Sequence, residues 1–141
     1  MRGLVAVCAL ALATFEPAVV FRTIARGADS RVAVHREIVA RTAGWWSVLW
    51  HEHAGNYEVP PIDFSKEMVI ALFAGRRDAE AAVELVSVTR TSGSVVVRYR
   101  VHGAAAARAA ANATSPFVMI AVPADRSPVR FIDVDASPDE R

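Results

Sequence analysis

The sequence predicts an α+β fold in which about seven mainly antiparallel strands pack around one amphipathic helix. Short apolar stretches rich in β-branched residues recur along the chain between glycine, proline and polar turn residues, which is typical of strands. The apolar spacing changes to the helical period over residues 42–54. The 141 residues, of which 53% are hydrophobic and 22% charged, fit one globular domain.

The N-terminal residues have the pattern of an export signal. Arg2 supplies a positive charge, an apolar run follows over residues 3–12, and residues 11–13 fit a cleavage site flanked by small side chains. We therefore expect a signal peptide at residues 1–13 and a periplasmic or secreted protein. An uncleaved first strand or helix is the alternative.

The rest of the chain divides into a folded domain at residues 14–134 and a polar tail at residues 135–141. The apolar run near the N-terminus is shorter than the roughly 20 residues that cross a bilayer, so no membrane span is expected. Cys8 is the only cysteine and lies inside the predicted signal peptide. The mature chain would therefore carry no thiol for disulfides, catalysis or metal binding.

Two strands are expected before the helix. Residues 18–24 are rich in β-branched side chains and are followed by a glycine-containing turn. Residues 31–40 alternate between apolar and polar side chains, which is the pattern of a strand with one buried face.

The helix is expected over residues 42–54. Thr42 is a good N-cap residue, and Gly55 followed by asparagine is a typical helix end. The prolines that follow shortly afterwards forbid continuation of the helix.

Three tryptophans lie on this helix. Trp46 and Trp50 are one turn apart, so they are expected to pack in the core, with His53 as a semi-buried polar cap on the same face. Trp45 points about 100° away from Trp46. It is the best candidate for an exposed interaction anchor, and a rim contact with a neighbouring loop is the alternative.

The second half of the domain is expected to hold the remaining strands. Residues 68–74 are apolar on both faces, which predicts a central strand covered on both sides. The alanine-rich residues 103–113 fit either a short helix or an ordered loop. The other expected strands are 84–89 and 94–101, which form a hairpin, and 116–123 and 129–134.

Asp63, followed by Phe64, stands just before the expected central strand. Its carboxylate is expected to bond backbone N–H groups of the following turn and so to fix how the strand enters the sheet. Direct contact with a ligand is the alternative.

Composition and motifs argue against several classes of function. The net charge of +1 comes from interspersed acids and bases, so no nucleic-acid partner is expected. His51 and His53 are two residues apart, whereas a zinc protease needs two histidines one helical turn apart, so no metal is expected. The sequence has no glycine-rich phosphate loop, dinucleotide fingerprint or Gly-x-Ser-x-Gly motif, so no cofactor and no catalysis are expected.

A series of residues in chain order carries a family resemblance, most specifically from Trp46 to Gly75. The matching segments are Trp46-Ser47-Val48-Leu49-Trp50 with His53, Pro61-Ile62-Asp63-Phe64-Ser65-Lys66-Glu67-Met68-Val69-Ile70, Phe73 with Gly75, Phe21–Gly27 with Ser30, Thr114-Ser115-Pro116-Phe117, and Val129-Arg130-Phe131. Over residues 21–131 the chain resembles the C-terminal domain of the PrcB family, the accessory protein of a bacterial surface protease complex.

The resemblance implies a non-catalytic protein that binds a secreted or surface protease and stabilises it. After the residue that matches Gly75 the family usually has a Pro-Thr-Gly-Gly-Tyr turn, and this chain has a different sequence over residues 76–82. The candidate contact residues are Trp45, Arg76, Arg77, Asp78 and Arg108. The residues expected to be structural are Trp46, Trp50, His53, Asp63, Phe64, Gly75 and Pro116.

Two other functions stay open. A small apolar-ligand-binding protein of the cell envelope would have a cavity between helix and sheet, lined by Trp50 and Phe73. A hydrolase would need a serine or aspartate within hydrogen-bonding reach of a histidine in a cleft. The histidines concerned are His35, His51, His53 and His102.

Overall fold

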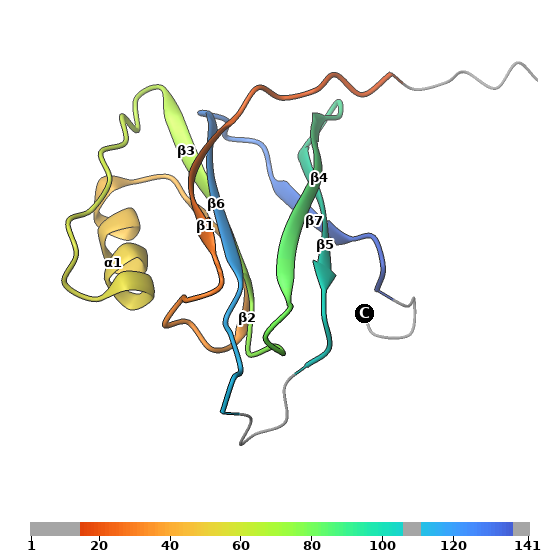
Figure 1. Cartoon of the computed structure of the whole chain (residues 1–141). Coiled ribbons are helices and arrows are strands. Elements are labelled where there is room, and N and C mark those ends of the chain that lie inside the picture. The colour runs from red at the N-terminus through yellow and green to blue at the C-terminus, as the bar shows by residue number, and fades with distance from the viewer. Residues whose placement is uncertain (1–14, 106–110, 137–141) are drawn as a thin grey trace, which may run out of the picture.

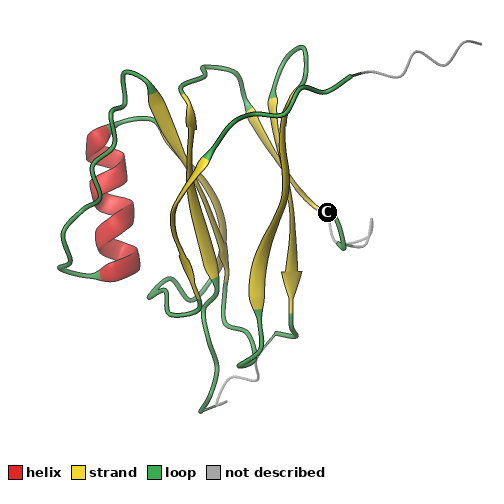
Figure 2. Cartoon of the chain, turned by 45° about the horizontal axis from the view of Figure 1, so that its top comes forward, coloured by secondary structure: helices red, strands yellow, loops and turns green. Residues whose placement is uncertain are grey.

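Two β-sheets face each other, and a helix covers the outer face of one of them. The computed structural model describes residues 15–105 and 111–136. Figures 1 and 2 show the two sheets side by side, with α1 against the sheet that contains β3. The elements are β1 (Arg22–Gly27), β2 (His35–Ala40), α1 (Ala43–Ala54), β3 (Glu67–Ala74), β4 (Ala82–Arg90), β5 (Val95–His102), β6 (Phe117–Pro123) and β7 (Val129–Asp133).

The larger sheet has four antiparallel strands in the order β1-β6-β3-β2. The smaller sheet has the order β4-β5-β7, in which β4 and β5 are antiparallel and β5 and β7 are parallel. Seven mostly antiparallel strands and one helix in the described part of the chain confirm the predicted α+β, mainly β class. The strands do not surround the helix, however, because α1 packs on the larger sheet from outside (Figure 2).

Strand β3 shows why the sequence contains a long apolar run. Its even-numbered side chains from Met68 to Leu72 pack in the core between the two sheets. Its odd-numbered side chains from Val69 to Phe73 pack in a second core beneath α1. Both faces of the strand are buried, as the absence of polar alternation predicts.

Helix α1 begins and ends where the sequence predicts. The Thr42 hydroxyl accepts a hydrogen bond from the backbone N–H of Trp45 at 3.2 Å, which is an N-cap interaction. Gly55 has a φ of 74° and its N–H donates to the carbonyl of His51, which ends the helix.

Strand β1 starts later than the sequence pattern predicts. It begins at Arg22 instead of Ala18. Ala18 lies beside Thr89 of β4 in an isolated bridge and the N–H of Val19 donates to the carbonyl of Val88, so this part of the chain pairs with the smaller sheet and does not extend β1.

Strand β2 also starts late, at His35 instead of Arg31. The Ser30 hydroxyl accepts the backbone N–H of Val32 at 3.1 Å, which makes a side-chain turn. A serine that bonds its neighbouring backbone in this way competes with strand pairing, so the first residues of the alternating pattern stay outside the sheet.

The helical and strand periodicity of the sequence predicts a core of eleven residues, and nine of these are buried in the structure. Trp50 and Phe131 are partly buried and pack against this core. The other predicted core residues, Trp46, Leu49, Val69, Leu72, Phe73, Val97, Tyr99, Phe117 and Met119, are buried.

Some predictions concern residues outside the described ranges, namely the signal peptide at residues 1–13 with Cys8, Arg108, and residues 137–141 of the polar tail. The described parts of the alanine-rich stretch, residues 103–105 and 111–113, form loops and bridges without helix. No helix within residues 15–105 and 111–136 is long and apolar enough to cross a membrane.

Candidate protein-interaction surface

The exposed face of α1 carries two large apolar side chains beside the polar His51 and Glu52. Trp45 is 60% exposed and Val48 is 47% exposed, whereas the adjacent Trp46 is 2% exposed. A helix at the surface of a globular protein normally turns polar side chains outward. The helix is therefore less amphipathic than the sequence pattern predicts, and the indole of Trp45 is available for contacts.

Trp45 and Val48 border a shallow groove between α1 and β2. Arg36 and Glu52 form an ion pair in its wall, with 2.5 Å between guanidinium nitrogen and carboxylate oxygen. We call this the helix–strand groove, and it is lined by Arg36, Ile38, Ala40, Trp45, Val48, Leu49 and Glu52.

The hydrogen bonds at both ends of β3 show which of its residues bond to which neighbour. The N–H of Ala74 donates to the carbonyl of Pro116 at 2.9 Å, and the N–H of Ala124 donates to the carbonyl of Lys66 at 2.8 Å. Both bonds join an even-numbered position of β3 to the β6 side. Because bonding direction alternates along an antiparallel strand, the odd-numbered residues of β3 bond to β2.

This alternation leaves one edge of β2 with free backbone groups. In the β2–β3 register Arg36 lies opposite Phe73, so the even-numbered residues of β2 bond to β3. The N–H and C=O groups of His35, Glu37 and Val39 therefore point away from the sheet. No strand in the described part of the chain pairs with this edge.

A cleft opens between the sheets on the other side of β2. The Tyr99 hydroxyl donates to Oε2 of Glu37 at 2.9 Å, and the Tyr99 hydroxyl oxygen also lies 3.3 Å from Nε2 of His35. The cleft has a volume of about 260 Å³. We call it the inter-sheet cleft, and it is lined by His35, Glu37, Tyr99, Phe131, Ile132, Asp133 and Ala136.

The electrostatics of this cleft keep the Tyr99 hydroxyl protonated. Burial raises the pKa of Tyr99 first, and the hydrogen bond to Glu37 and the charges of Glu37 and Asp133 raise it further. The positive charge of Arg77 acts in the opposite direction. The phenol is therefore a fixed donor to Glu37 at neutral pH.

The candidate contact residues after Gly75 hold their own loop together. The Arg77 guanidinium donates to the carbonyl of Ala74 at 3.2 Å, and the Asp78 carboxylate accepts the backbone N–H of Ala104 at 3.0 Å. Arg76 is exposed, and its N–H bonds to the carbonyl of Ala33, before the start of β2. The structure thus does not bring this loop together with Trp45, which lies over Ile38 and Ala40 of β2. Arg108 lies outside the described residues.

The residues predicted to be structural do have structural contacts. Asp63 Oδ1 accepts two hydrogen bonds from Ser65, one from its backbone N–H at 3.0 Å and one from its side-chain hydroxyl at 2.6 Å. These bonds fix the turn before β3 and lower the pKa of Asp63. Gly75 has a φ of 78°, which favours glycine. Phe64 packs at the edge of the core beneath α1, Pro116 is fully buried, and the rings of Trp46 and Trp50 lie 5.5 Å apart.

His53 is a polar residue on the tryptophan face, as predicted, and it is more deeply buried than the predicted semi-buried cap. Its Nδ1 lies 2.8 Å from the Ser30 hydroxyl, and the two residues are 6% and 7% exposed. The ring packs 4.2 Å from that of Phe117 and 5.1 Å from that of Trp50. Burial lowers the pKa of His53, and the charge of Asp29 opposes this. A serine–histidine pair enclosed by aromatic rings offers a substrate no access, so its geometry is that of a structural clamp.

The other histidines lie at the surface. His51 Nδ1 is 2.7 Å from the backbone carbonyl of Ser47 one turn earlier and 3.4 Å from its hydroxyl. His102 Nε2 is 2.7 Å from a carboxylate oxygen of Glu84, which lowers the pKa of Glu84. No group of three or more His, Cys, Asp or Glu side chains in the described part of the chain is placed to hold a metal ion.

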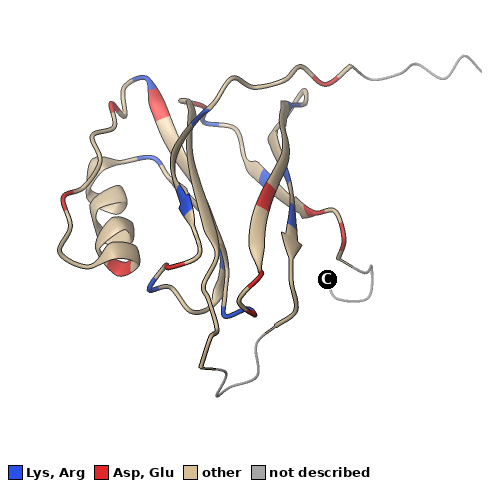
Figure 3. Cartoon of the chain, viewed as in Figure 1, with Lys and Arg blue, Asp and Glu red and all other residues tan. Residues whose placement is uncertain are grey.

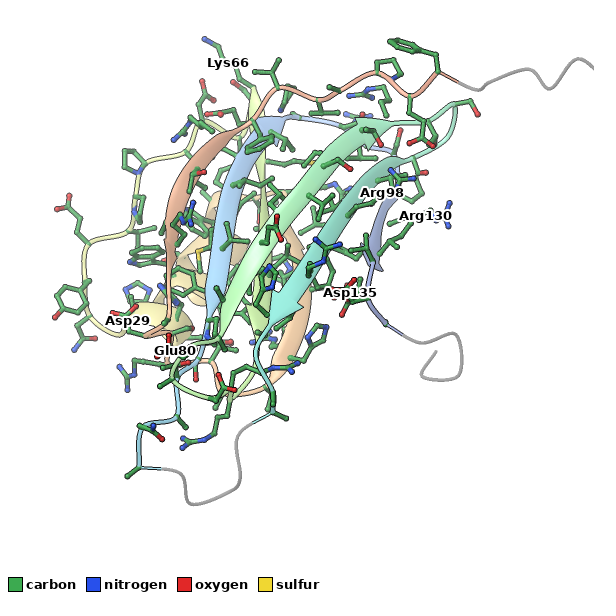
Figure 4. The ribbon with its side chains drawn as sticks, turned by 45° about the vertical axis from the view of Figure 1, so that its right-hand side comes forward. Asp29, Lys66, Glu80, Arg98, Arg130 and Asp135 are labelled. Carbon is green, nitrogen blue, oxygen red and sulfur yellow. The ribbon has the colours of Figure 1, made fainter. Side chains whose placement is uncertain are left out.

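The outer face of the smaller sheet carries charges of both signs. Figure 3 shows acidic and basic residues distributed over both sheets, and Figure 4 shows Arg98 and Arg130 on the smaller one and Asp135 in the turn after β7. Arg98 lies 3.0 Å from a carboxylate oxygen of Glu16, and this bond lowers the pKa of Glu16. Arg100 lies 2.7 Å from Asp135. Arg98 and Arg100 are therefore each paired with an acidic neighbour.

The sequence predicts the exposure of Trp45 but does not predict the free edge of β2 or the inter-sheet cleft. The signal for the cleft was the pair His35 and Glu37, which share one face of β2 with Val39. Two polar side chains on the face that should be buried indicate that this part of the strand lines an opening. No sequence signal shows that β2 lies at the edge of its sheet.

Comparison with known proteins identifies no relative of this chain. No family model, curated protein or solved structure matches the chain. The functional proposals below therefore depend on the surface just described, together with the resemblance seen in the sequence.

Proposed function

We propose that this protein is a non-catalytic accessory protein that binds an extended segment of another protein at the free edge of β2. The proposal depends on one observation, an unpaired strand edge beside an exposed tryptophan. An added strand would bond to the free N–H and C=O groups of His35, Glu37 and Val39. The side chains of that strand would contact the helix–strand groove, where Trp45 supplies an aromatic anchor.

Two of the other edge strands, β1 and β4, carry features that discourage strand addition. The register of β1 shifts between Thr23 and Ala25, which marks a bulge or irregularity. The segment before β1 already bonds to β4, since the N–H of Val19 donates to the carbonyl of Val88 at 2.8 Å. In contrast, β2 has a continuous register over all its six residues and contains no proline.

The resemblance to the PrcB family supports a secreted or surface protease as the partner. The pattern of residues 1–13 supports export to the compartment where such a protease acts. Arg77 and Asp78 lie in the loop that replaces the glycine-rich turn of the family, and their side chains bond within the molecule. We therefore assign the partner contact to β2 and α1 and not to this loop.

The geometry does not favour the alternative of a small apolar ligand between helix and sheet. The space next to Trp50 and Phe73 is filled by aromatic side chains, with 5.1 Å between the ring centres of Trp50 and His53 and 6.0 Å between those of His53 and Phe73. The cavity of the helix–strand groove is only about 30 Å³, well below the roughly 300 Å³ at which ligand pockets begin.

Site-specific photo-crosslinking in cells that make the full chain tests the proposal. Benzoylphenylalanine replaces Val48 in the helix–strand groove or, as a matched control, Val86 of β4, because both valines are nearly half exposed. We expect a defined crosslinked protein at position 48, absent at position 86 and lost when Trp45→Ala is added. Equal crosslinking at the two positions, or none at position 48 in a folded protein, would contradict the proposal.

A further inference from the structure

Resting on the proposed strand addition, we infer that the segment bound at β2 alternates apolar side chains with basic ones. The apolar side chains lie over the shallow surface of the helix–strand groove, and a lysine or arginine enters the inter-sheet cleft. The inference follows from the different chemistry of the two faces of β2.

Each face of β2 borders a different site. Arg36, Ile38 and Ala40 line the helix–strand groove. His35 and Glu37 point to the opposite face and line the inter-sheet cleft. A strand added to the edge continues the sheet, so its alternate side chains meet these two sites in turn.

The helix–strand groove accepts an apolar side chain. Its exposed members Trp45 and Val48 stand beside the edge, and Ile38 and Leu49 are the apolar residues between them. The charges of Arg36 and Glu52 neutralise each other in an ion pair. An aliphatic or aromatic side chain would cover this surface without leaving a charge unpaired.

The inter-sheet cleft suits a cation on an apolar stem. Glu37 and Asp133 supply two carboxylates, and the rings of Tyr99 and Phe131 supply apolar walls. The Tyr99 hydroxyl bonds to Oε2 of Glu37, which leaves Oε1 available for a donor from a partner. A lysine or arginine would lay its methylene groups along the rings and donate to the carboxylates.

The other charged groups near the cleft leave it acidic. Arg77 is the nearby cation that acts on Tyr99, and its guanidinium nitrogens already donate to the carbonyls of Ala74 and Gly103. His35 stacks beside Tyr99 with 6.3 Å between ring centres. An acidic side chain of a partner would therefore face two carboxylates at close range, which disfavours it.

A second copy of this chain fits the edge less well than a basic strand does. Two β2 edges that paired about a twofold axis would place both Glu37 side chains on the same face of the joined sheet. In a register that places the two Glu37 side chains directly opposite each other, their like charges destabilise the pairing. An experiment on this edge must therefore also detect self-association of the protein.

The test uses the isotope-labelled full chain and four acetylated peptides of about eight residues, a length that can pair along one strand. The peptides alternate valine with lysine, with glutamate or with threonine, and the fourth contains the valines and lysines in two blocks. We expect the valine–lysine peptide to shift the backbone amide signals of β2 and β7. The glutamate peptide should bind at least about tenfold more weakly, and the blocked peptide should also be weaker.

Two variants separate this inference from the proposed function. Glu37→Gln combined with Asp133→Asn should remove the preference for lysine over threonine but keep binding of the threonine peptide. Trp45→Ala should weaken the binding of the lysine peptide and of the threonine peptide equally.

Equal binding of the lysine, threonine and glutamate peptides at β2 would overturn the basic preference and leave the proposed strand addition unaffected. The absence of any peptide effect together with a positive crosslink at position 48 would also overturn it, whereas failure of both experiments removes the proposed function. Concentration-dependent shifts of β2 without peptide would identify a second copy as the occupant and overturn the inference.

Discussion

The Ser30 hydroxyl and Nδ1 of His53 lie 2.8 Å apart in the interior and join the loop before β2 to the last turn of α1. A second bond strengthens this junction, because the backbone N–H of Arg31 donates to the carbonyl of His53 at 2.9 Å. Since the helix–strand groove is bounded by α1 and β2, the pair of bonds fixes the spacing of its two walls.

Ser30→Ala should lower the free energy of unfolding by about 1–3 kcal/mol, the usual effect of leaving a buried polar group without its partner. The substitution removes the partner of the His53 ring and one acceptor of the Val32 N–H. Urea unfolding measures the change. Ser92→Ala, at an exposed turn position, is the matched control and should have little effect. A loss no larger than that of the control would show that the bond contributes little.

The pKa of His53 makes stability depend on pH. Burial lowers its folded pKa below the value of about 6.5 that a histidine has in an unfolded chain. Its contribution is therefore complete above pH 6.5 and declines as the pH falls through the folded pKa. The stability difference between the native protein and His53→Gln should shrink between about pH 7 and pH 5, as urea unfolding at each pH would show. A difference that is constant across this range would contradict the prediction.

The sequence predicts the elements well because their signals are local. The period-2 alternation of residues 95–101, the N-cap at Thr42 and the φ-permissive Gly55 each depend on neighbours within one element. The predicted strand boundaries are less accurate where a side chain competes with the backbone hydrogen bonds between strands, as Ser30 does before β2.

The candidate site could be predicted only in part, because its other components come from distant parts of the chain. Tyr99 and Glu37 are 62 residues apart, and periodicity shows which face each occupies but not which strands are neighbours. Strand β2 has a free edge because β6 pairs with both β1 and β3, so that β2 is the last strand beyond β3. This order is a property of the whole topology. Trp45 was identified because its exposure follows from helix geometry alone.

Substitution of the two adjacent tryptophans on α1 should have very different effects on the stability of the fold. Trp46→Ala should cost about 3–5 kcal/mol, because the buried indole fills the core and donates to the carbonyl of Pro60 at 2.9 Å. Trp45→Ala should change stability by no more than about 0.5 kcal/mol, since its side chain is mostly in solvent. Urea unfolding of both variants makes the comparison. Similar losses would mean that Trp45 is part of the packed core and would remove the anchor from the proposed function.

Gly75 should not tolerate a side chain. Its φ of 78° disfavours other residues by about 1–2 kcal/mol, and an added Cβ would lie 3.0 Å from the backbone nitrogen of His35, the first residue of β2. Gly75→Ala should therefore destabilise the fold by at least this amount in urea. Gly93→Ala is the matched control, because a Cβ there would meet nothing within 4 Å. Equal stability of the two variants would contradict this account of the turn.

Tyr99 should resist ionisation while the protein is folded. In the variant Tyr57→Phe it is the only tyrosine, so the ultraviolet absorbance of tyrosinate reports on it alone. Burial and Glu37 raise its pKa well above the usual value of about 10, so the neutral phenol stabilises the fold fully below pH 10 and this contribution is lost as the pH rises further. We expect the tyrosinate signal to appear together with loss of the far-ultraviolet circular dichroism of the folded state.

In Glu37→Gln the midpoint of the Tyr99 titration should return only part of the way toward the usual pKa of a tyrosine, because burial is the largest cause of the shift. A signal centred near pH 10 in a protein that is still folded would mean that solvent reaches the hydroxyl, and the inter-sheet cleft would then lack the fixed donor that orients Glu37 toward a basic partner.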